Sequence, residues 1–355
     1  MPKPRRRLLF WMLGGLLVLA AGGLMVGCSL SAPRYQGPQS AHFNGKQFVN
    51  QGEVRAQDGL GPLLRWMLHR DKGPFPEQPN LPYGPKPPAR VGRGQLRVTF
   101  VNHGTFLLQF DSLNVLTDPI WSERCSPFQW IGPRRLRPPG LHFDDLPPID
   151  AVLISHNHYD HLDLPTLQRL FARDRPRVFA GLGVRALLEK EGIGGGVDMD
   201  WWQQQALRPG VQVQCVPAQH FSGRGLRDRD ATLWAGYVLH TSAGRVYYAG
   251  DTGYGPFFGE IGRRAGPLEL AILPIGAYRP QWFMQPIHVS PAEAVQALRD
   301  LGARRGVATH FGTFQMADDG RDEPVRDLRA ALRRQQLPDS AFLVLPEGVG
   351  WQLPR

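Results

Sequence analysis

Four potential metal ligands lie within six residues, directly after a short apolar run, and this feature constrains the chain most. The run AVLIS (151–155) is typical of a strand covered on both faces, and it leads into His156, His158, Asp160 and His161. A lone histidine is more often structural, but this cluster could not be buried without a bound charge. Imidazole and carboxylate ligands without thiolate suit zinc or another borderline divalent ion. We therefore expect a metal site in which His156 and His158 converge on one point, with Asp160 and His161 at a neighbouring one.

Further ligand candidates follow other strand-like runs. His220 comes after VQVQCVPAQ, Asp251 after RVYYAG, and His310 after GVAT. If these strands are neighbours, their carboxyl ends line one edge, although His220 or His310 alone could equally be structural. Five imidazoles and two carboxylates suffice for two metals, and a carboxylate such as Asp251 can offer one oxygen to each ion. Two ions about 3.5–4 Å apart would supply hydroxide near neutral pH, which favours hydrolysis at phosphorus or an acyl centre.

Composition excludes several alternatives. The 355 residues contain three cysteines, which rules out a disulfide-stapled miniprotein and a cysteine-based zinc ribbon. No repeat of solenoid or propeller length is visible. The net charge of +10 suits an anionic substrate or a lipid surface as well as DNA. No surface of interleaved basic and aromatic residues is readable, so we expect no nucleic-acid partner.

The N-terminus predicts export. Residues 1–27 combine a basic start with a long apolar run, as in a signal peptide or an uncleaved membrane anchor. The run ends in MVGCS, which resembles a lipobox with Cys28 as the lipidated residue, and Arg5-Arg6 weakly suggests a twin-arginine signal. We therefore expect the periplasmic side of the cell envelope, with Cys28 or the apolar segment as the anchor. Cys125 and Cys215 could pair there or stay buried.

The rest of the chain divides into two parts. Residues 28–89 are a Pro/Gly-rich extension, interpreted as a tether and irregular wrap with one amphipathic candidate at 61–70, and residues 90–355 form the hydrolase domain. Strands outnumber helices, which indicates two sheets covered by helices. The strand candidates are 96–101, 105–110, 113–118, 151–155, 177–181, 211–216, 232–240, 245–250, 268–275 and 306–310, and the helix candidates are 163–171 with Asp163 as cap, 184–192, 291–302 and 323–335.

Several stretches resemble the metallo-β-lactamase superfamily, and within it the family of N-acylphosphatidylethanolamine-hydrolysing phospholipase D. They include DAVLISHNHYDHLD, AQHFSGRG, YYAGDTGY, LPIGAYRPQWFMQPIHVSPAEAV and ATHFGTF, and they cover most of residues 90–320. The resemblance implies an α/β fold, the αββα sandwich of two mixed β-sheets flanked by helices. It also implies two Zn²⁺ ions per chain. One would be bound by His156, His158 and His220, the other by Asp160, His161 and His310, with Asp251 bridging.

The same resemblance assigns roles near the metals. It implies that Asp160, Asp251 and the non-ligand His288 are catalytic, with His288 hydrogen-bonding or relaying a proton to a phosphoryl oxygen. A structural role for His288, just before a helix, stays open. His103 and Asp118 are expected to orient ligands. The remaining histidines are interpreted as structural or solvated: His42, His69, His142 and His240.

Two segments could face a substrate. One is an apolar loop, for which two interpretations stay open. It is a lip that contacts acyl chains or a membrane, or it packs against Pro-rich loops; its residues are Tyr278, Trp282, Phe283 and Met284. A basic loop could meet phosphate headgroups, although solvated side chains are the favoured interpretation; its residues are Arg134, Arg135 and Arg137.

The function expected from the sequence is an exported zinc-dependent phosphodiesterase. Its substrate would be a phospholipid or a related amphiphile, attacked by hydroxide held between two metals, and a membrane surface would be a partner. One alternative keeps the metals but hydrolyses a lactone or another ester, as sugar-phosphate lactonases do. The other is a non-catalytic envelope lipoprotein in which the metal is a structural clamp. The sequence indicates no oligomeric state.

Overall fold

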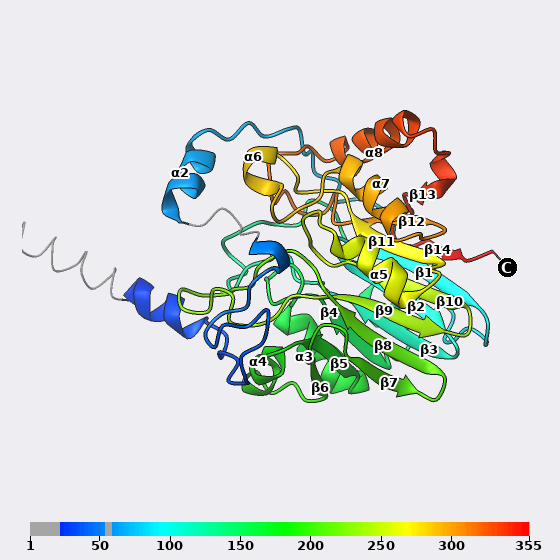
Figure 1. Cartoon of the computed structure of the whole chain (residues 1–355), viewed down its shortest axis with the longest axis horizontal. Coiled ribbons are helices and arrows are strands. Elements are labelled where there is room, and N and C mark those ends of the chain that lie inside the picture. The colour runs from blue at the N-terminus through cyan, green and yellow to red at the C-terminus, as the bar shows by residue number, and fades with distance from the viewer. Residues whose placement is uncertain (1–21, 54–58, 355) are drawn as a thin grey trace, which may run out of the picture.

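The fold is an αββα sandwich, confirming the predicted class (Figure 1). The computed structural model describes residues 22–53 and 59–354. The predicted targeting segment, 1–27, lies largely outside these residues, and its described end is helical at 22–29. Within the described part of the chain, no helix is both long and apolar enough to traverse a bilayer.

The first sheet combines antiparallel and parallel strands. Its strands are β1 (Leu96–Asn102), β2 (Thr105–Phe110), β3 (Leu113–Thr117), β4 (Ala151–Ile154), β5 (Arg177–Gly181), β6 (Gly196–Met199) and β14 (Gly350–Gln352). They are arranged in the order β14-β1-β2-β3-β4-β5-β6. The pairs from β14 to β3 are antiparallel and those from β3 to β6 are parallel.

The second sheet repeats this plan. Its strands are β7 (Gln204–Arg208), β8 (Val211–Val216), β9 (Gly236–Thr241), β10 (Gly244–Tyr248), β11 (Leu270–Pro274), β12 (Gly306–Thr309) and β13 (Phe342–Leu343). The order is β13-β12-β11-β10-β9-β8-β7. Strands β7 to β10 pair antiparallel, and β10 to β13 pair parallel. As a result, β8, β10, β11 and β12 all point in the same direction.

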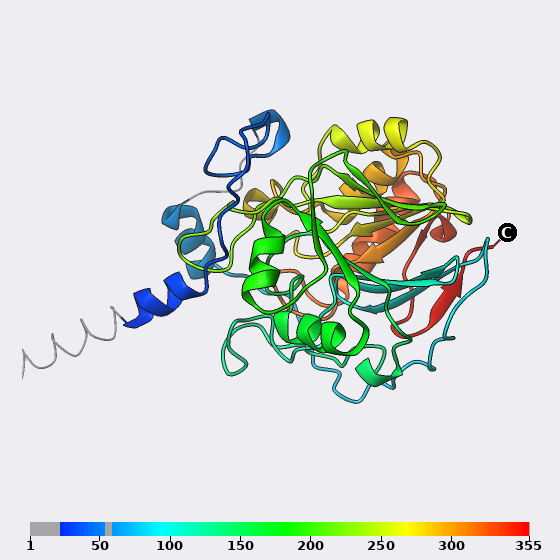
Figure 2. The same ribbon diagram turned by 90° about the horizontal axis from the view of Figure 1, so that it is seen from below.

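Helices cover the outer faces of both sheets (Figure 2). On the first sheet they are α3 (Leu164–Asp174) and α4 (Val184–Lys190); on the second, α5 (Phe257–Ala265), α7 (Pro291–Asp300) and α8 (Glu323–Arg334). Two others, α2 (Leu60–Leu68) and α6 (Gln281–Met284), lie beside the cavity described below. Short 3₁₀ turns complete the described elements: Gln51–Glu53, Phe143–Asp145 and Asp339–Ala341.

The helix ends show how local sequence sets the boundaries. Ser290 and Glu293 form a capping box at the start of α7, because each side chain bonds the other residue's backbone N–H. Asp163 stands at the cap position of α3, but its carboxylate does not cap the helix. It accepts instead from the backbone of Trp121 and Ser122. The predicted cap is therefore correct in position and wrong in its hydrogen bonds.

The main core lies between the two sheets, and part of the N-terminal extension belongs to it. Phe43 and Phe48 are both 2% exposed and share one buried cluster with Phe100, Tyr237 and other strand residues. Fully burying such a side chain stabilises a fold by roughly 1.5–3 kcal/mol. This part of the extension, interpreted from its sequence as a tether and irregular wrap, therefore contributes to the core.

Every strand and helix expected from the sequence is present, and several are shorter than expected, most of all the strand at 232–240. The run 232–240 forms a strand only from Gly236, because Leu233 and Ala235 donate their backbone N–H groups to Leu182 and Ser155 outside the sheet. The sequence patterns do not predict strands β6, β7, β13 and β14 or helices α5 and α6, and α6 forms in a segment expected to be a loop. Helix α5 contains Gly262, where a Cβ would lie 2.5 Å from the Leu301 carbonyl. Glycine there permits α5 to pack closely on the end of α7. Because glycine has a low helix propensity, it also makes this helix harder to predict from the sequence.

Candidate metal centre

All seven predicted ligands converge at one edge of the sandwich. His220, Asp251 and His310 follow β8, β10 and β12, whose carboxyl ends lie at the same edge of the second sheet. His156 follows β4 in the first sheet, and the HNHYDH turn brings the rest of its cluster against that edge. The expectation that strand ends share one edge is therefore confirmed, with the difference that two sheets contribute.

Three imidazoles form the first ligand group. His156 Nε2 lies 2.7 Å from His158 Nδ1, and His220 Nε2 lies 3.4 Å from the same atom. His156 and His220 are each 1% exposed. Ligand atoms about 2.0–2.1 Å from one tetrahedral zinc are roughly 3.3 Å apart, so this triad is close to the required spacing.

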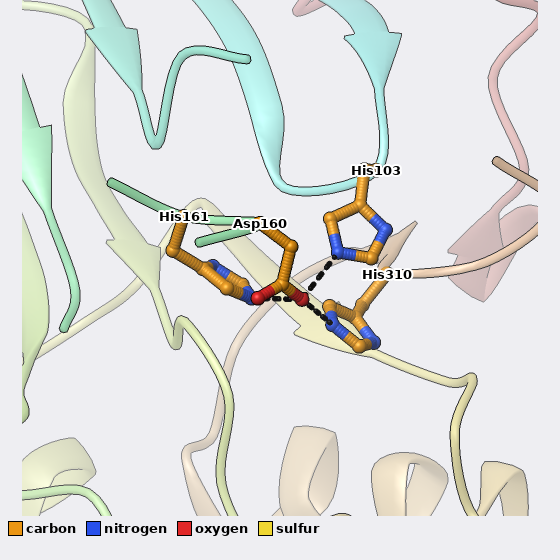
Figure 3. A group of neighbouring side chains, drawn as sticks. All are labelled: His103, Asp160, His161 and His310. Carbon is orange, nitrogen blue, oxygen red and sulfur yellow. Dashed lines mark hydrogen bonds and ion pairs between the residues drawn. The ribbon is translucent and has the colours of Figure 1, made fainter. Parts of the chain in front are cut away.

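Two imidazoles and two carboxylates form the second group (Figure 3 shows all but Asp251). Asp160 Oδ2 is 3.3 Å from His161 Nε2 and 3.5 Å from His310 Nε2. Asp251 Oδ2 is 3.2 Å from His161 Nε2 and 3.0 Å from His310 Nε2. Each carboxylate oxygen thus lies 3.0–3.5 Å from both imidazole nitrogens, which is the spacing of ligands around one small cation.

Unsatisfied polar atoms support the fit of this donor set to metal. Among the described residues, His161 Nε2, His310 Nε2 and Asp251 Oδ1 are buried and make no well-directed hydrogen bond. Such atoms are unfavourable in a protein interior unless an ion or hydrogen bond compensates them. Asp251 directs Oδ2 to the second group and has Oδ1 left over, which is the arrangement a bridging carboxylate requires.

The electrostatics of the two groups differ. Burial lowers the pKa of His156 and His220 well below the usual imidazole range and that of His158 to about 4, so these rings are neutral at pH 7. Burial also acts on His310, but the Asp251 and Asp160 carboxylates outweigh it and raise its pKa to about 9. The second group therefore holds a cation at pH 7, which is either a proton or a metal ion.

A buried carboxylate holds several of these side chains in place. Asp118 is fully buried, and its Oδ2 lies 2.7 Å from His161 Nδ1 while it accepts from the Ser155 and Tyr248 hydroxyls at 2.6 and 2.5 Å. Ser155 Oγ in turn lies 2.9 Å from His156 Nδ1. These contacts fix ring orientation, and the expected role of Asp118 is confirmed.

His103 contacts the second group in the same way. Its Nε2 lies 2.9 Å from Asp160 Oδ2, and its ring is 4.1 Å from that of His310 between centroids. His103 comes from the turn between β1 and β2, so it reaches the site from the first sheet. Its predicted position beside a ligand is confirmed.

Two residues that hold the site were missed in the sequence. Arg224 Nη1 donates to the carbonyls of Asn157 and Leu162, at 2.8 and 2.9 Å, and so holds the HNHYDH turn. Asn50 bonds both backbone groups of His220: Nδ2 donates to the carbonyl at 2.9 Å, and Oδ1 accepts from the N–H at 3.0 Å. Asn50 is 170 positions from His220 in the chain. No local pattern could have indicated that contact.

A cavity of about 610 Å³ opens over the ligands. His288 lines it, with Nδ1 3.8 Å from Asp251 Oδ2, and burial lowers the pKa of His288 to about 4 despite that carboxylate. His288 is therefore neutral at pH 7 and lines the cavity beside Asp251. The apolar part of the wall includes Leu63, Trp66, Phe221, Phe283, Met284, Ile287 and Met316.

The segment expected either to face a substrate or to pack against the fold divides between these two positions. Phe283 and Met284 line the cavity, and Phe283 stacks on Trp66 of α2 at 5.1 Å. Trp282 is 43% exposed beside them. Tyr278 lines no part of this cavity; it is buried, and its hydroxyl donates to Asp327 at 2.6 Å.

The interpretation of the basic loop as solvated is wrong for two of its three arginines. Arg135 is 6% exposed and donates to the carbonyls of Ser122 and Ile120. Arg137 is largely buried against Glu347. Only Arg134 is exposed, and none of the three lines the cavity. The two buried guanidinium groups bind the loop to the fold, where neighbouring carbonyls and a carboxylate compensate their burial.

The other histidines and the cysteines lie outside the ligand groups. His42 pairs with Asp200 at 2.6 Å and stacks on Trp201, which confirms a structural role. The other three histidines interpreted as structural or solvated contact groups outside the metal centre. His69 contacts the Arg65 carbonyl, His142 the Tyr83 ring and His240 the Gln214 side chain. Cys125 and Cys215 are buried and do not pair.

Comparisons with known proteins agree with this geometry. The family described as a beta-lactamase superfamily domain matches residues 113–311. N-acyl-phosphatidylethanolamine-hydrolyzing phospholipase D 1 of Caenorhabditis elegans is 34% identical over 273 residues, which are 72% of this chain and 76% of that protein. An uncharacterized protein of Mycobacterium tuberculosis is 39% identical over 315 residues, covering 86% and 83%.

A solved structure shows the same fold. Igni18, a metallo hydrolase from Ignicoccus hospitalis, superposes with a TM-score of 0.56 at 20% identity, covering 74% of this chain and 99% of that one. The chain therefore belongs to the metallo-β-lactamase superfamily of metal-dependent hydrolases, among the relatives of the N-acyl-phosphatidylethanolamine-hydrolysing phospholipases D.

Proposed function

We propose that this hydrolase is a phosphodiesterase that acts on a phospholipid or a related amphiphile with two zinc ions. One observation carries the proposal: two adjacent ligand groups lie at the base of an apolar cavity. The metal end suits the anionic phosphodiester, and the apolar wall suits acyl chains. The name of the nematode relative supports this substrate class.

The ligand residues have separate tasks in this reaction. His156, His158 and His220 would hold one ion, and Asp160, His161 and His310 the other, with Asp251 between them. When bound, the pair of ions supplies an activated water and stabilises charge on the phosphate oxygens. His288, neutral and beside Asp251, would donate its ring N–H to a phosphoryl oxygen, as a hydrogen bond or as a proton relayed to that oxygen from the activated water. The cavity walls exclude water from the apolar part of the substrate.

The surface around the cavity supports a membrane-facing orientation. On α2, Leu64, Met67 and Leu68 are 49%, 58% and 78% exposed. The segment that contains Cys28 lies near the same side, because the Leu226 N–H donates to the Gly27 carbonyl at 3.0 Å in the loop after His220. We propose that Cys28 carries a lipid or that the preceding segment anchors the chain in the cell envelope. The exposed face of α2 then contacts the bilayer that supplies the substrate.

The test is a substrate panel with the zinc-loaded protein. We expect turnover of phospholipid phosphodiesters, and we expect His158→Ala to reduce kcat/KM at least about a thousandfold, because one zinc loses a third of its imidazole ligands. His240→Ala is the matched control, since this histidine lies away from the metal groups, and it should retain activity. Hydrolysis of lactones alone would overturn the proposal in favour of an esterase. No turnover of any ester, with metal content intact, would favour a structural metal.

A further inference from the structure

A small cavity lies behind the second ligand group, on the side remote from Asp160. It measures about 10 Å³, and three of the residues that line it are His103, His310 and Asp319. This is about the room that one water molecule needs. The small cavity and the large one share three lining residues, His310, Ala277 and Met316. Their other lining residues differ.

Each of these three residues has a buried polar atom without a hydrogen-bond partner among the described residues. The atoms are His103 Nδ1, His310 Nδ1 and Asp319 Oδ1, on side chains of residues that are 1%, 3% and 6% exposed. Figure 3 shows that the second nitrogen of both imidazoles points away from Asp160. The other oxygen of Asp319 accepts from the Ala277 N–H at 3.1 Å, which fixes the carboxylate. Three unsatisfied atoms around one cavity indicate a bound group that satisfies them together.

The protonation of the two rings defines what that group must be. If His310 uses Nε2 as a metal ligand, its proton is on Nδ1, which then needs an acceptor. His103 Nε2 faces the Asp160 carboxylate at 2.9 Å and so carries a proton, which leaves Nδ1 as an acceptor. Asp319 Oδ1 is also an acceptor. The group bound in the cavity must therefore accept one hydrogen bond, from His310, and donate two, to His103 and Asp319.

We propose that this cavity binds a water molecule, and that Asp319 is a positioning residue which acts through this water on His310 and His103. A water molecule accepts from His310 and donates to His103 and Asp319, which satisfies all three atoms. An ammonium ion could not accept from His310, and an anion could not donate to the other two. The bound water fixes the tautomer that leaves His310 Nε2 free for metal and His103 Nε2–H directed at Asp160.

The inference rests on the metal centre of the proposed function but not on the reaction assigned to it. Its test is therefore metal binding and ring protonation, measured without substrate. Asp319→Ala removes an acceptor, and we expect a 10–100-fold loss of affinity for one of the two zinc ions in a chelator competition. Asp319→Asn can still accept from the water through its amide oxygen, and it should lose less than about threefold. The neighbouring Asp318→Asn is the matched control, because Asp318 bonds Trp66 and Arg70 and does not line this cavity.

Two readouts distinguish positioning from a general loss of stability. In the zinc-loaded wild type, ¹⁵N spectra of labelled histidine should show His310 protonated at Nδ1 and His103 protonated at Nε2, with the His103 signal changed in Asp319→Ala. A high-resolution crystal structure of the wild type should show one water within hydrogen-bond distance of all three atoms. Unchanged zinc affinity and spectra in Asp319→Ala, or a wild-type cavity without a water, would overturn the inference. The wild-type crystal structure tests the bound water even if the Asp319→Ala variant does not fold.

Discussion

Neighbouring carboxylates decide the protonation of individual imidazoles in this site. His158 has no close carboxylate that outweighs burial, and its pKa falls to about 4. His310 is more deeply buried, at 3% exposed, but Asp251 and Asp160 lie 3.0 and 3.5 Å from its Nε2. Its pKa therefore rises to about 9. In the metal-free protein at pH 7, His158 is therefore neutral and His310 is charged, because only His310 has carboxylates close enough to outweigh its burial.

This difference predicts the pH dependence of zinc binding. The neighbouring carboxylates raise the pKa of both His310 and His161, so an ion that enters the second group must displace up to two protons. We expect the affinity of one zinc to rise by roughly tenfold to a hundredfold per pH unit between pH 6 and 8. The other zinc, bound by imidazoles that are already neutral, should show little change over this range. Chelator competition across pH measures both; equal slopes for the two ions would contradict the assignment.

At the scale of elements, an N-terminal strap comprising residues 31–50 holds the loop that carries His220. The backbone N–H of Ala32 donates to Asp228, and those of Tyr35 and Phe48 donate to the carbonyls of Ala231 and Asp230. The strap ends at Asn50, which bonds the backbone of His220. The segment next to the predicted anchor is therefore part of the metal site.

We expect Asn50→Ala to weaken zinc binding at the His220 group. The substitution leaves the backbone groups of His220 without their side-chain partner, at a cost of about 1–3 kcal/mol, and permits the ring to shift. Zinc affinity at this group should fall 10–100-fold, while the group around His310 keeps its ion. Cobalt substitution followed by absorption spectroscopy can separate the two groups.

His42→Ala is the control for this experiment. His42 belongs to the same strap, but it contacts Asp200 and Trp201 away from the metals. This variant should lower the free energy of unfolding and still bind both ions. Loss of both ions in either variant would indicate that the strap acts on overall stability alone.

At the scale of the whole molecule, the sandwich concentrates its chemistry at one end. The carboxyl ends of strands from both sheets meet at the metal groups, and α2 and α6 flank the cavity there, while β14 lies at the opposite end (Figure 1). An apolar face beside the cavity mouth suits a substrate that resides in a bilayer. The membrane-facing orientation that we propose would therefore depend on the complete fold.

A charge on the exposed face of α2 should weaken membrane binding. We expect Leu68→Glu to reduce sedimentation with phosphatidylethanolamine–phosphatidylglycerol vesicles several-fold for the protein without its N-terminal segment, since Leu68 is 78% exposed. The control is Val349→Glu, because Val349 is also apolar and exposed, at 45%, but lies next to β14. Zinc content should stay the same in both variants. Equal loss of binding in the two variants would contradict a membrane face on α2.

Local sequence patterns account for much of the geometry of the site. Strand alternation and the turn after β4 set the two points on which the HNHYDH side chains converge, and strand-end positions predicted His220, Asp251 and His310. Local patterns encode such features because periodicity and turn chemistry act over a few residues. Other features are visible only in the folded chain: the contact of Asn50 with His220, the burial of Arg135 and Arg137, and the direction of Tyr278. These depend on which surfaces pack together across long separations in the chain, and packing of that kind leaves no periodic signal in the sequence.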